Sequence, residues 1–253
     1  MERRITFVNH ATLLIEIGGV SILTDPIYSL MVSPVVPRLR RPGIPFDNLP
    51  PIDLILISHN HYDHLHLRTL RRLARRNPST LFLPSGDGTY GRRAGFRDIV
   101  EIPWWASVER NGVRVTAVPA KHTAGRFPWD RNKSTCNGYV LETNGTRLYY
   151  AGDTGYSVLF KEIGERFTID GALLPIGAYK PYDWFREIHL NPHSAVQAFL
   201  DLEAKFFVPY HWGTFKISDE PMSEPPVLLR QEAERFEISD RVHILRNGES
   251  FSW

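Results

Sequence analysis

Six consecutive residues, His59–His64, place three imidazoles and one carboxylate close together. They directly follow the apolar run Pro51–Ile57, which we predict to be a short buried β-strand because it is rich in branched residues and has no helical period. Loops at the carboxyl ends of strands commonly carry the chemistry of α/β proteins. A histidine-rich surface turn is the alternative, but exposed side chains of these types would gain little from clustering. The pattern therefore indicates a metal site with four ligands from this run: His59, His61, Asp63 and His64.

Three further candidate ligands occur later in the chain, each directly after a run of strand character. They are His122, Asp153 and His211. A lone histidine of this kind is more often a packed residue, and it is the shared position after strands that favours ligands. If those strands are neighbours in packed sheets, their loops converge on one rim and bring seven ligands together. Such a set is too large for one tetrahedral zinc ion and suits two metal ions that share a carboxylate.

The order of these residues resembles the metallo-β-lactamase superfamily, whose signature is His-x-His-x-Asp-His followed by distant His, Asp and His ligands. The resemblance implies an α/β fold, the αββα four-layer sandwich, and a bridging role for Asp153 between two metals. It assigns His59, His61 and His122 to one metal, and Asp63, His64 and His211 to the other.

The true β-lactamases of the superfamily use a cysteine in the second site. The only cysteine here, Cys136, stands in a Ser-Thr-Cys-Asn-Gly segment far from any ligand position. The set of His and Asp ligands is instead similar to the hydrolase branches, which include phosphodiesterases, nucleases, lactonases and thioesterases.

A narrower resemblance runs from about residue 5 to residue 250. Its specific pieces are Pro-Ile-Gly-Ala-Tyr at Pro175–Tyr179 and His-Trp-Gly-Thr-Phe at His211–Phe215. With four other segments they are similar to the N-acylphosphatidylethanolamine-hydrolysing phospholipase D family. These segments are Asn9–Thr12, Leu23–Pro26, Ile57–Leu65 and Ala151–Tyr156. The stretch Lys121–Thr135 departs from the animal members of that family.

The resemblance implies two divalent metal ions as cofactors. We expect Zn²⁺, with Mn²⁺, Fe²⁺ or Co²⁺ as alternatives because His and Asp sites also accept them. Two such ions lower the pKa of a shared water and neutralise charge on a phosphoryl oxygen. We therefore expect a hydrolase that cleaves a phosphodiester, a phospholipid of the N-acylphosphatidylethanolamine type, by attack of a metal-bridging hydroxide. The alternatives are a lactonase similar to ascorbate-6-phosphate lactonases, a nuclease of the same superfamily, or, less favoured, a non-catalytic binding scaffold.

Other polar residues are candidates for supporting roles. By the resemblance, His189 is an additional active-site histidine that binds a phosphoryl oxygen or protonates the leaving alkoxide, and with Asp63 it completes the predicted catalytic residues. A loop histidine is the alternative. Asp25 could orient a ligand imidazole or form an Asx-turn, and we leave both open. For His10 the structural role is slightly favoured. Three histidines that do not follow strands are predicted to be surface residues: His66, His193 and His243.

The elements that would position these residues form two β-rich halves without a fixed repeat, so we expect residues 1–253 to be a single domain. The predicted strands of the first half are Ile5–Val8, Thr12–Ile17, Val20–Thr24 and Thr80–Leu83, with a Gly18-Gly19 hairpin turn. Those of the second half are Arg114–Val118, Gly138–Glu142, Arg147–Ala151, Gly171–Leu174 and Phe206–Pro209. The predicted helices are Leu65–Arg76 and Pro192–Ala204, the second with Asn191 as N-cap.

Two segments could face a lipid surface. The helix Leu65–Arg76 carries five arginines on one face; a solvated face over a leucine stripe is favoured, and an anion-attracting face is the alternative. The proline-rich segment Ser29–Phe46 mixes apolar and basic residues, which suits a lid that touches lipid or a loop packed on the domain.

Composition sets the remaining bounds on partners and compartment. The formal charge of +2 does not argue for nucleic acid, and we expect none as a partner. No run approaches the roughly 18 apolar residues of a membrane span, and the start of the chain leaves no room for a signal peptide. One cysteine agrees with a reducing compartment. We expect a cytoplasmic protein with a small-molecule or lipid phosphodiester substrate, and peripheral contact with anionic membranes as a variant. The oligomeric state stays open, with a homodimer among the alternatives.

Overall fold

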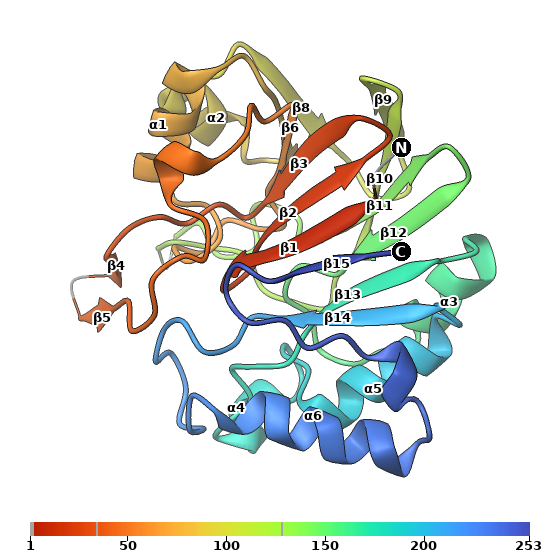
Figure 1. The fold of residues 1–253 in the computed structure, drawn as a ribbon. Coiled ribbons are helices and arrows are strands. Elements are labelled where there is room, and N and C mark those ends of the chain that lie inside the picture. The colour runs from red at the N-terminus through yellow and green to blue at the C-terminus, as the bar shows by residue number, and fades with distance from the viewer. Residues whose placement is uncertain (1–2, 34, 128) are drawn as a thin grey trace.

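Two β-sheets pack face to face, and helices cover the outer face of each sheet (Figure 1). The computed structural model describes residues 3–33, 35–127 and 129–253. The arrangement is the αββα sandwich of the α/β class that the sequence predicts. Because both faces of each sheet are covered, most strand residues are buried whichever way their side chains point.

The first sheet has seven strands in the order β15-β1-β2-β3-β6-β7-β8. Their bounds are β1 (Arg4–Asn9), β2 (Thr12–Ile17), β3 (Val20–Thr24), β6 (Leu54–Leu56), β7 (Thr80–Pro84), β8 (Asp98–Ile102) and β15 (Ser250–Ser252). β3, β6, β7 and β8 run parallel, so their carboxyl ends meet at one edge. The helices α1 (Leu67–Arg76) and α2 (Gly88–Ala94) cover this sheet.

The second sheet has six strands in the order β14-β13-β12-β11-β10-β9. Their bounds are β9 (Ser107–Arg110), β10 (Val113–Pro119), β11 (Asn137–Thr143), β12 (Thr146–Tyr150), β13 (Gly171–Pro175) and β14 (Phe206–Tyr210). The helices on this side are α3 (Leu159–Arg166), α4 (Tyr182–Phe185), α5 (Pro192–Asp201) and α6 (Glu224–Arg235). A small hairpin of β4 (Met31–Ser33) and β5 (Val36–Pro37) protrudes from the sandwich (Figure 1). Short 3₁₀ helices occupy Phe46–Asn48 and Ser239–Arg241.

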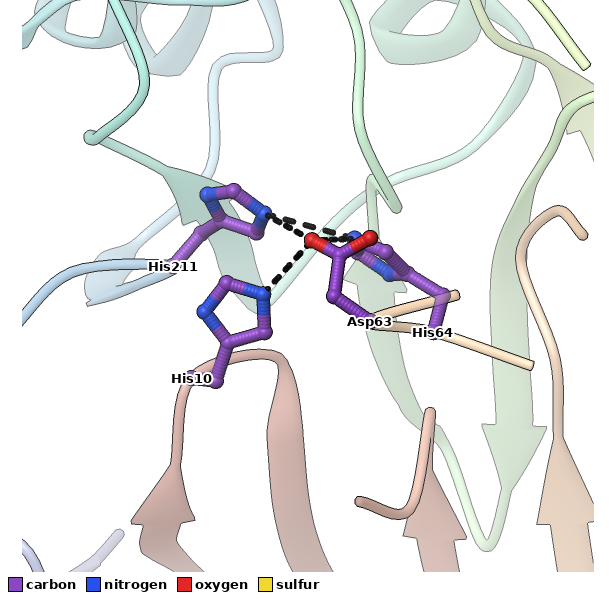
Figure 2. Close-up of side chains that lie close together, drawn as sticks. All are labelled: His10, Asp63, His64 and His211. Carbon is purple, nitrogen blue, oxygen red and sulfur yellow. Dashed lines mark hydrogen bonds and ion pairs between the residues drawn. The ribbon is translucent and has the colours of Figure 1, made fainter. Parts of the chain in front are cut away.

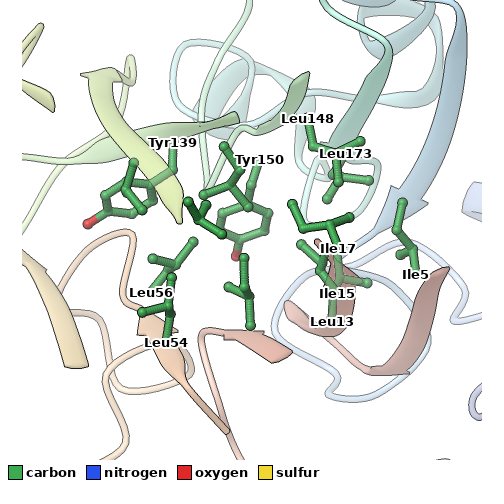
Figure 3. Packing of buried hydrophobic residues seen from close by; sticks show 14 of the residues in the cluster. Ile5, Leu13, Ile15, Ile17, Leu54, Leu56, Tyr139, Leu148, Tyr150 and Leu173 are labelled. Carbon is green, nitrogen blue, oxygen red and sulfur yellow. The ribbon is translucent and has the colours of Figure 1, made fainter. Parts of the chain in front are cut away.

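Alternation of side chains along the strands builds separate apolar layers. In β2, Leu13 and Ile15 face the layer between the sheets, whereas Leu14 packs in the layer under α1 (Figure 3). In β12, Tyr150 likewise faces the central layer and Tyr149 the layer under α3 and α5. This period of two follows directly from strand geometry. Strands with apolar residues on both faces thus contribute to the layer between the sheets and to a layer under the helices.

Most predicted elements are confirmed, with shifted ends. The hairpin turn is confirmed by positive φ at Gly18 (62°) and Gly19 (82°). The strand predicted over Pro51–Ile57 is wrong at its ends, because the ladder to β3 and β7 covers only β6. α1 begins two residues later than predicted because the His66 side chain caps it by accepting from Thr69 N. The N-cap role of Asn191 is confirmed by a capping box with Ser194.

Several elements were not predicted from the sequence. They are α2, α3, α4, α6, β4, β5, β8, β9 and β15. In the part of the chain that the structure describes, no helix combines the length and apolar character that crossing a bilayer requires.

Candidate metal centre

Loops at one edge of the sandwich bring all seven predicted ligands together. The loop after β6 carries the His59–His64 run, and the loops after β10, β12 and β14 carry His122, Asp153 and His211. His59 and His64 are fully buried, and Asp153 is 2% exposed. The edge is where strands of both sheets end, so residues far apart in sequence reach one point.

The first cluster of potential ligands contains His59, His61 and His122. One ligand atom from each lies within 4.8 Å of those from the other two. His61 Nδ1 is 2.9 Å from His59 Nε2 and 3.2 Å from His122 Nε2. Burial lowers the pKa of His59 well below its usual value and that of His122 to about 3. These rings are therefore uncharged at neutral pH and keep a lone pair for a cation.

The second cluster contains Asp63, His64, His211 and also His10 (Figure 2). Asp63 Oδ2 lies 2.9 Å from His10 Nε2 and 3.7 Å from His211 Nε2. His64 Nε2 is 3.3 Å from His211 Nε2, and the planes of the two rings differ by only 16°. The side chains come from three separate loops and converge on the same small volume.

Asp153 lies between the two clusters. Its Oδ2 is 3.1 Å from His64 Nε2 and 3.2 Å from His211 Nε2. The same carboxylate also groups with His59 and His64, and separately with His122 and His189. Burial alone would raise the pKa of Asp153, but the adjacent His211 and His64 hold it well below the usual range. An ionised carboxylate in this place could contact a cation on either side.

The donor set fits divalent cations. Among the described residues, Asp153 Oδ1 is buried and has no hydrogen-bond partner, and neither do the Nδ1 atoms of His211 and His189. Buried polar atoms are normally paired, so unpaired ones inside a histidine cluster point to a group that they would bind. Neutral imidazole nitrogens and carboxylate oxygens are the usual ligands of zinc and related metals. The cluster is therefore able to hold metal.

Asp25 supports the cluster from behind. Its Oδ2 is 2.6 Å from His64 Nδ1 and accepts from the hydroxyls of Ser58 and Tyr150, each at 2.6 Å. Its Oδ1 accepts from Ser58 N at 2.8 Å. Of the two roles left open for Asp25, these contacts favour the orienting one. A carboxylate on Nδ1 directs Nε2 of His64 into the site.

His122 and His211 are also held in place by the backbone. His122 Nδ1 lies 2.8 Å from the Ile188 carbonyl, which directs its Nε2 toward the cluster. His211 has a positive φ of 63°, and its N–H donates to the His10 carbonyl at 2.8 Å. The Gly-Ala-Tyr sequence packs on the same residue: a Cβ on Gly177 would meet the His211 carbonyl oxygen at 2.1 Å. This motif thus needs glycine because two backbones touch there.

The structural role favoured for His10 is wrong, because its ring is part of the second cluster. The side chain is 2% exposed, and its ring centre is 4.1 Å from that of His211. His10 occupies the turn between β1 and β2, at the edge where the ligand loops end. His10 also directly follows a strand, as the predicted ligands do. Sequence reasoning missed it because the two-residue turn between β1 and β2 does not look like a ligand-bearing loop.

His189 lies beside the cluster, as the resemblance implied. It is 9% exposed, its Nδ1 is 3.8 Å from Asp153 Oδ2, and its ring centre is 4.9 Å from that of His122. Burial lowers its pKa to about 4, so the ring is neutral at pH 7. Its ring is buried and its Nδ1 lacks a hydrogen-bond partner among the described residues, which favours the active-site role over an ordinary loop histidine.

The remaining histidines and the cysteine give mixed outcomes. His193 is exposed, as predicted, but His66 and His243 are half-buried, so their prediction as surface residues is wrong. His66 caps α1, and the His243 ring stacks 3.7 Å from that of Phe251. Cys136 is buried and lines the same hollow as His122. It is therefore far from the predicted ligands in the sequence but close to one of them in the structure. Burial raises the pKa of its thiol to about 12.

Arg126 is a supporting residue that sequence reasoning missed. Its Nη1 donates to the carbonyls of Asn60 at 2.9 Å and Leu65 at 2.7 Å, which lie at the two ends of the ligand run. Its guanidinium also stacks 3.8 Å from the centre of the Tyr62 ring. Asn60 Oδ1 accepts from Gly125 N at 2.7 Å, which fastens the two loops a second time. Arg126 could not be recognised from the sequence, because contacts to backbone carbonyls have no sequence motif.

Comparison with known proteins agrees with this arrangement. The Beta-lactamase superfamily domain model matches residues 21–212. An uncharacterized protein of Mycobacterium tuberculosis is 38% identical over 91% of this chain, which spans 64% of that relative's length. An N-acyl-phosphatidylethanolamine-hydrolyzing phospholipase D of Caenorhabditis elegans is 33% identical, covering 89% of this chain and 68% of its own. A UPF0173 metal-dependent hydrolase of Methanopyrus kandleri is 31% identical over 98% and 99% of the two chains.

Solved structures show the same fold. A metallo hydrolase of Ignicoccus hospitalis superposes with a TM-score of 0.77 at 22% identity, over 100% of this chain and 99% of the other. An isothiocyanate hydrolase from Delia radicum gut bacteria has a TM-score of 0.81 at 18% identity, over 99% and 100%.

Proposed function

Because this chain belongs to the metallo-β-lactamase superfamily, we propose that it is a metal-dependent hydrolase that cleaves phosphodiesters. The substrate class that we propose is a phospholipid of the N-acylphosphatidylethanolamine type, acted on with two bound metal ions, of which Zn²⁺ is the first candidate. The name of the Caenorhabditis elegans relative supports the phospholipid substrate. The name of the Methanopyrus kandleri relative supports metal-dependent hydrolysis.

The observation that carries the proposal is the pair of ligand clusters joined by Asp153. Asp153 lies 3.1 Å from His64 in the second cluster, and it also groups with His59 and with His122 of the first cluster, so its carboxylate is placed to serve both sides. An all-His/Asp set differs from a site that uses cysteine. Cys136 belongs to none of the groups of potential ligands found among the described residues. This donor set supports hydrolysis of phosphate esters better than a β-lactamase activity.

Bound divalent ions would supply Lewis acidity and an activated water. The chain's own residues then have distinct tasks. Asp63 Oδ2, with His10 Nε2 at 2.9 Å, holds one side of the cluster in place. The neutral His189 ring can donate an N–H hydrogen bond to a phosphoryl oxygen, and its protonated form, held beside Asp153 at 3.8 Å, could give a proton to the departing alkoxide.

A lipid substrate is supported by the apolar side chains on the protruding hairpin. Leu30 is 79% exposed and Val35 84% exposed, in the segment Ser29–Phe46. Arg68, on α1, lines a hollow together with Leu30 and Met31, so cationic and apolar groups stand side by side. Such a surface suits peripheral contact with an anionic membrane.

Turnover assays distinguish this proposal from its rivals. Metal-loaded protein should hydrolyse bis(p-nitrophenyl) phosphate and release phosphatidic acid from N-acylphosphatidylethanolamine vesicles, with little turnover of a lactone panel. Preference for lactones would replace the phosphodiesterase with a lactonase, and cleavage of RNA would favour a nuclease. Absence of hydrolysis on all three classes, with metal bound, would leave a binding scaffold.

A further inference from the structure

A hollow of about 510 Å³ opens beside the candidate metal centre. His189 lies on its wall, so the hollow leads from solvent to the clustered ligands. Its other walls are mainly polar but include the rings of Tyr156 and Tyr182, and among the described residues no aliphatic side chain lines it. The side chains that matter for recognition are Lys121, Tyr182, Arg186, Glu187 and Gln197. We call this hollow the Arg186 pocket.

Backbone contacts fix the walls of the Arg186 pocket. Gly155 N donates to the Lys121 carbonyl at 2.9 Å, and a Cβ on Gly155 would meet the Glu187 carbonyl oxygen at 2.2 Å. His189 N donates to the Phe185 carbonyl at 2.8 Å, which ties the end of α4 to the pocket. Three segments from different parts of the chain are thus packed backbone to backbone. A ligand would meet a pocket that is already formed, which lowers the entropic cost of binding.

In the Arg186 pocket, Lys121 has a close acidic partner and Arg186 does not. Glu187 Oε2 is 2.6 Å from Lys121 Nζ, whereas its Oε1 is 3.8 Å from Arg186 Nε, too far for a hydrogen bond. The Arg186 side chain is 53% exposed. His193, also on the wall, has its own partner in Glu232 at 2.8 Å. Arg186 therefore has guanidinium donors available, and these suit a planar anion.

We propose that the Arg186 pocket binds the hydrophilic end of the substrate and that Arg186 selects a second anionic group there, a carboxylate or a phosphate. The orientation rests on the phosphodiesterase activity in the proposed function and not on its lipid substrate, because both alcohols of N-acylphosphatidylethanolamine carry acyl chains and neither carries a second anion. A phosphodiester held near His189 and Asp153 would direct one of its alcohols into this pocket. A hydrocarbon chain in the same place would remove water from charged and amide groups without replacing their hydrogen bonds.

Three p-nitrophenyl phosphodiesters test the selection kinetically. Their second alcohols are ethanol, choline and glycolate, which add no charge, a cation and a carboxylate. The glycolate ester should have a KM about tenfold below that of the ethyl ester, the usual effect of one charge-assisted hydrogen bond. Arg186→Gln should remove this advantage with kcat within twofold, and Arg186→Glu should shift the preference to the choline ester. The matched control is Arg246→Gln, because Arg246 Nε also lies 3.8 Å from a glutamate and outside the pocket.

Equilibrium binding separates failure of this proposal from failure of the proposed function. 4-Phosphonobutyrate and butylphosphonate differ only in a terminal carboxylate. On metal-loaded protein the first should bind about tenfold more tightly, and the advantage should vanish in Arg186→Gln and persist in Arg246→Gln. The same result without turnover of any phosphodiester would retain the pocket and refute the activity. Equal binding of both ligands to the unaltered protein, or equal losses in the two variants, would overturn the pocket.

Discussion

Asp153 is the side chain whose replacement most directly tests the paired centre. Its Oδ2 lies within 3.2 Å of His64 and His211 in the second cluster, and the carboxylate also groups with His59 and with His122 of the first. Its Oδ1 is buried without a partner among the described residues. We expect about two divalent ions per chain in the purified protein, and Asp153→Ala should lose metal and nearly all activity. Metal content measured by plasma mass spectrometry checks this, with the exposed Asp240→Ala as control. A variant that kept both ions and normal turnover would refute a shared carboxylate.

His189 tests chemistry apart from ligation. Its Nδ1 lies 3.8 Å from Asp153 Oδ2, and it also groups with His122 and Asp153 as a potential ligand. If His189 acts on the substrate and not on metal, His189→Ala should keep its full metal content. Loss of a proton donor or phosphoryl contact should lower kcat by ~10²–10⁴-fold. Steady-state kinetics and metal analysis on the same samples check both parts. Loss of metal would make His189 a ligand, and unchanged kinetics would make it an ordinary loop residue.

At the scale of residues, the sequence predicts which candidate ligands come together, but it predicts the residues that support them poorly. The seven candidate ligands each follow a strand-like run, and that position could be read without knowing the fold. Asp25 could be named but not decided, because only the fold places its carboxylate 2.6 Å from His64. Arg126 could not be predicted, since it acts on backbone carbonyls that any residue would offer.

At the scale of elements, the loop that carries Arg126 should govern how firmly the ligand run is held. Arg126→Met removes donors to the carbonyls of Asn60 and Leu65, so the loop can relax. We expect metal affinity to fall by ~10–100-fold, the usual effect of losing a residue that orients ligands. Competition with a chromophoric chelator measures this. Arg131→Met, an exposed change in the same loop, should leave affinity unchanged. Equal affinity in both variants would leave the Arg126 contacts without a role in metal binding.

Elements were predictable where both faces of a strand are apolar or where end signals are strong. β2 and β3 match their predicted bounds because a two-glycine turn fixes their ends. α6 was missed because two prolines in its first turn resemble a loop, although proline is tolerated there. β15 has three residues and gains its strand geometry only by pairing with β1, a contact between the two ends of the chain. Such long-range pairing leaves no local pattern.

At the scale of the whole molecule, the question is which surface meets a lipid aggregate. The five arginines of α1 do not all point freely into solvent. The alternative in which all five attract anionic headgroups is therefore wrong. Arg76 donates to backbone carbonyls of the Phe46–Asn48 turn, and Arg72 stacks 3.7 Å from the centre of the Phe46 ring. These two hold the proline-rich segment on the domain. Arg68 and Arg75 are exposed and remain available to anionic headgroups.

The protruding hairpin and these two arginines should therefore act together at a membrane. The protein should bind anionic vesicles more tightly than neutral ones, and less so as salt rises, because near-surface arginines contribute ~1 kcal/mol each and are screened within a Debye length. Arg68→Gln with Arg75→Gln, and separately Leu30→Ser with Val35→Ser, should raise KM for vesicle substrate without changing hydrolysis of bis(p-nitrophenyl) phosphate. Val227→Ser, an exposed change on α6, is the control for lost apolar surface. Equal losses on both substrates would assign the changed residues to folding. If neither vesicle hydrolysis nor bis(p-nitrophenyl) phosphate hydrolysis is reduced, the arginines only form a solvated helix face, and a small soluble ester becomes the favoured substrate.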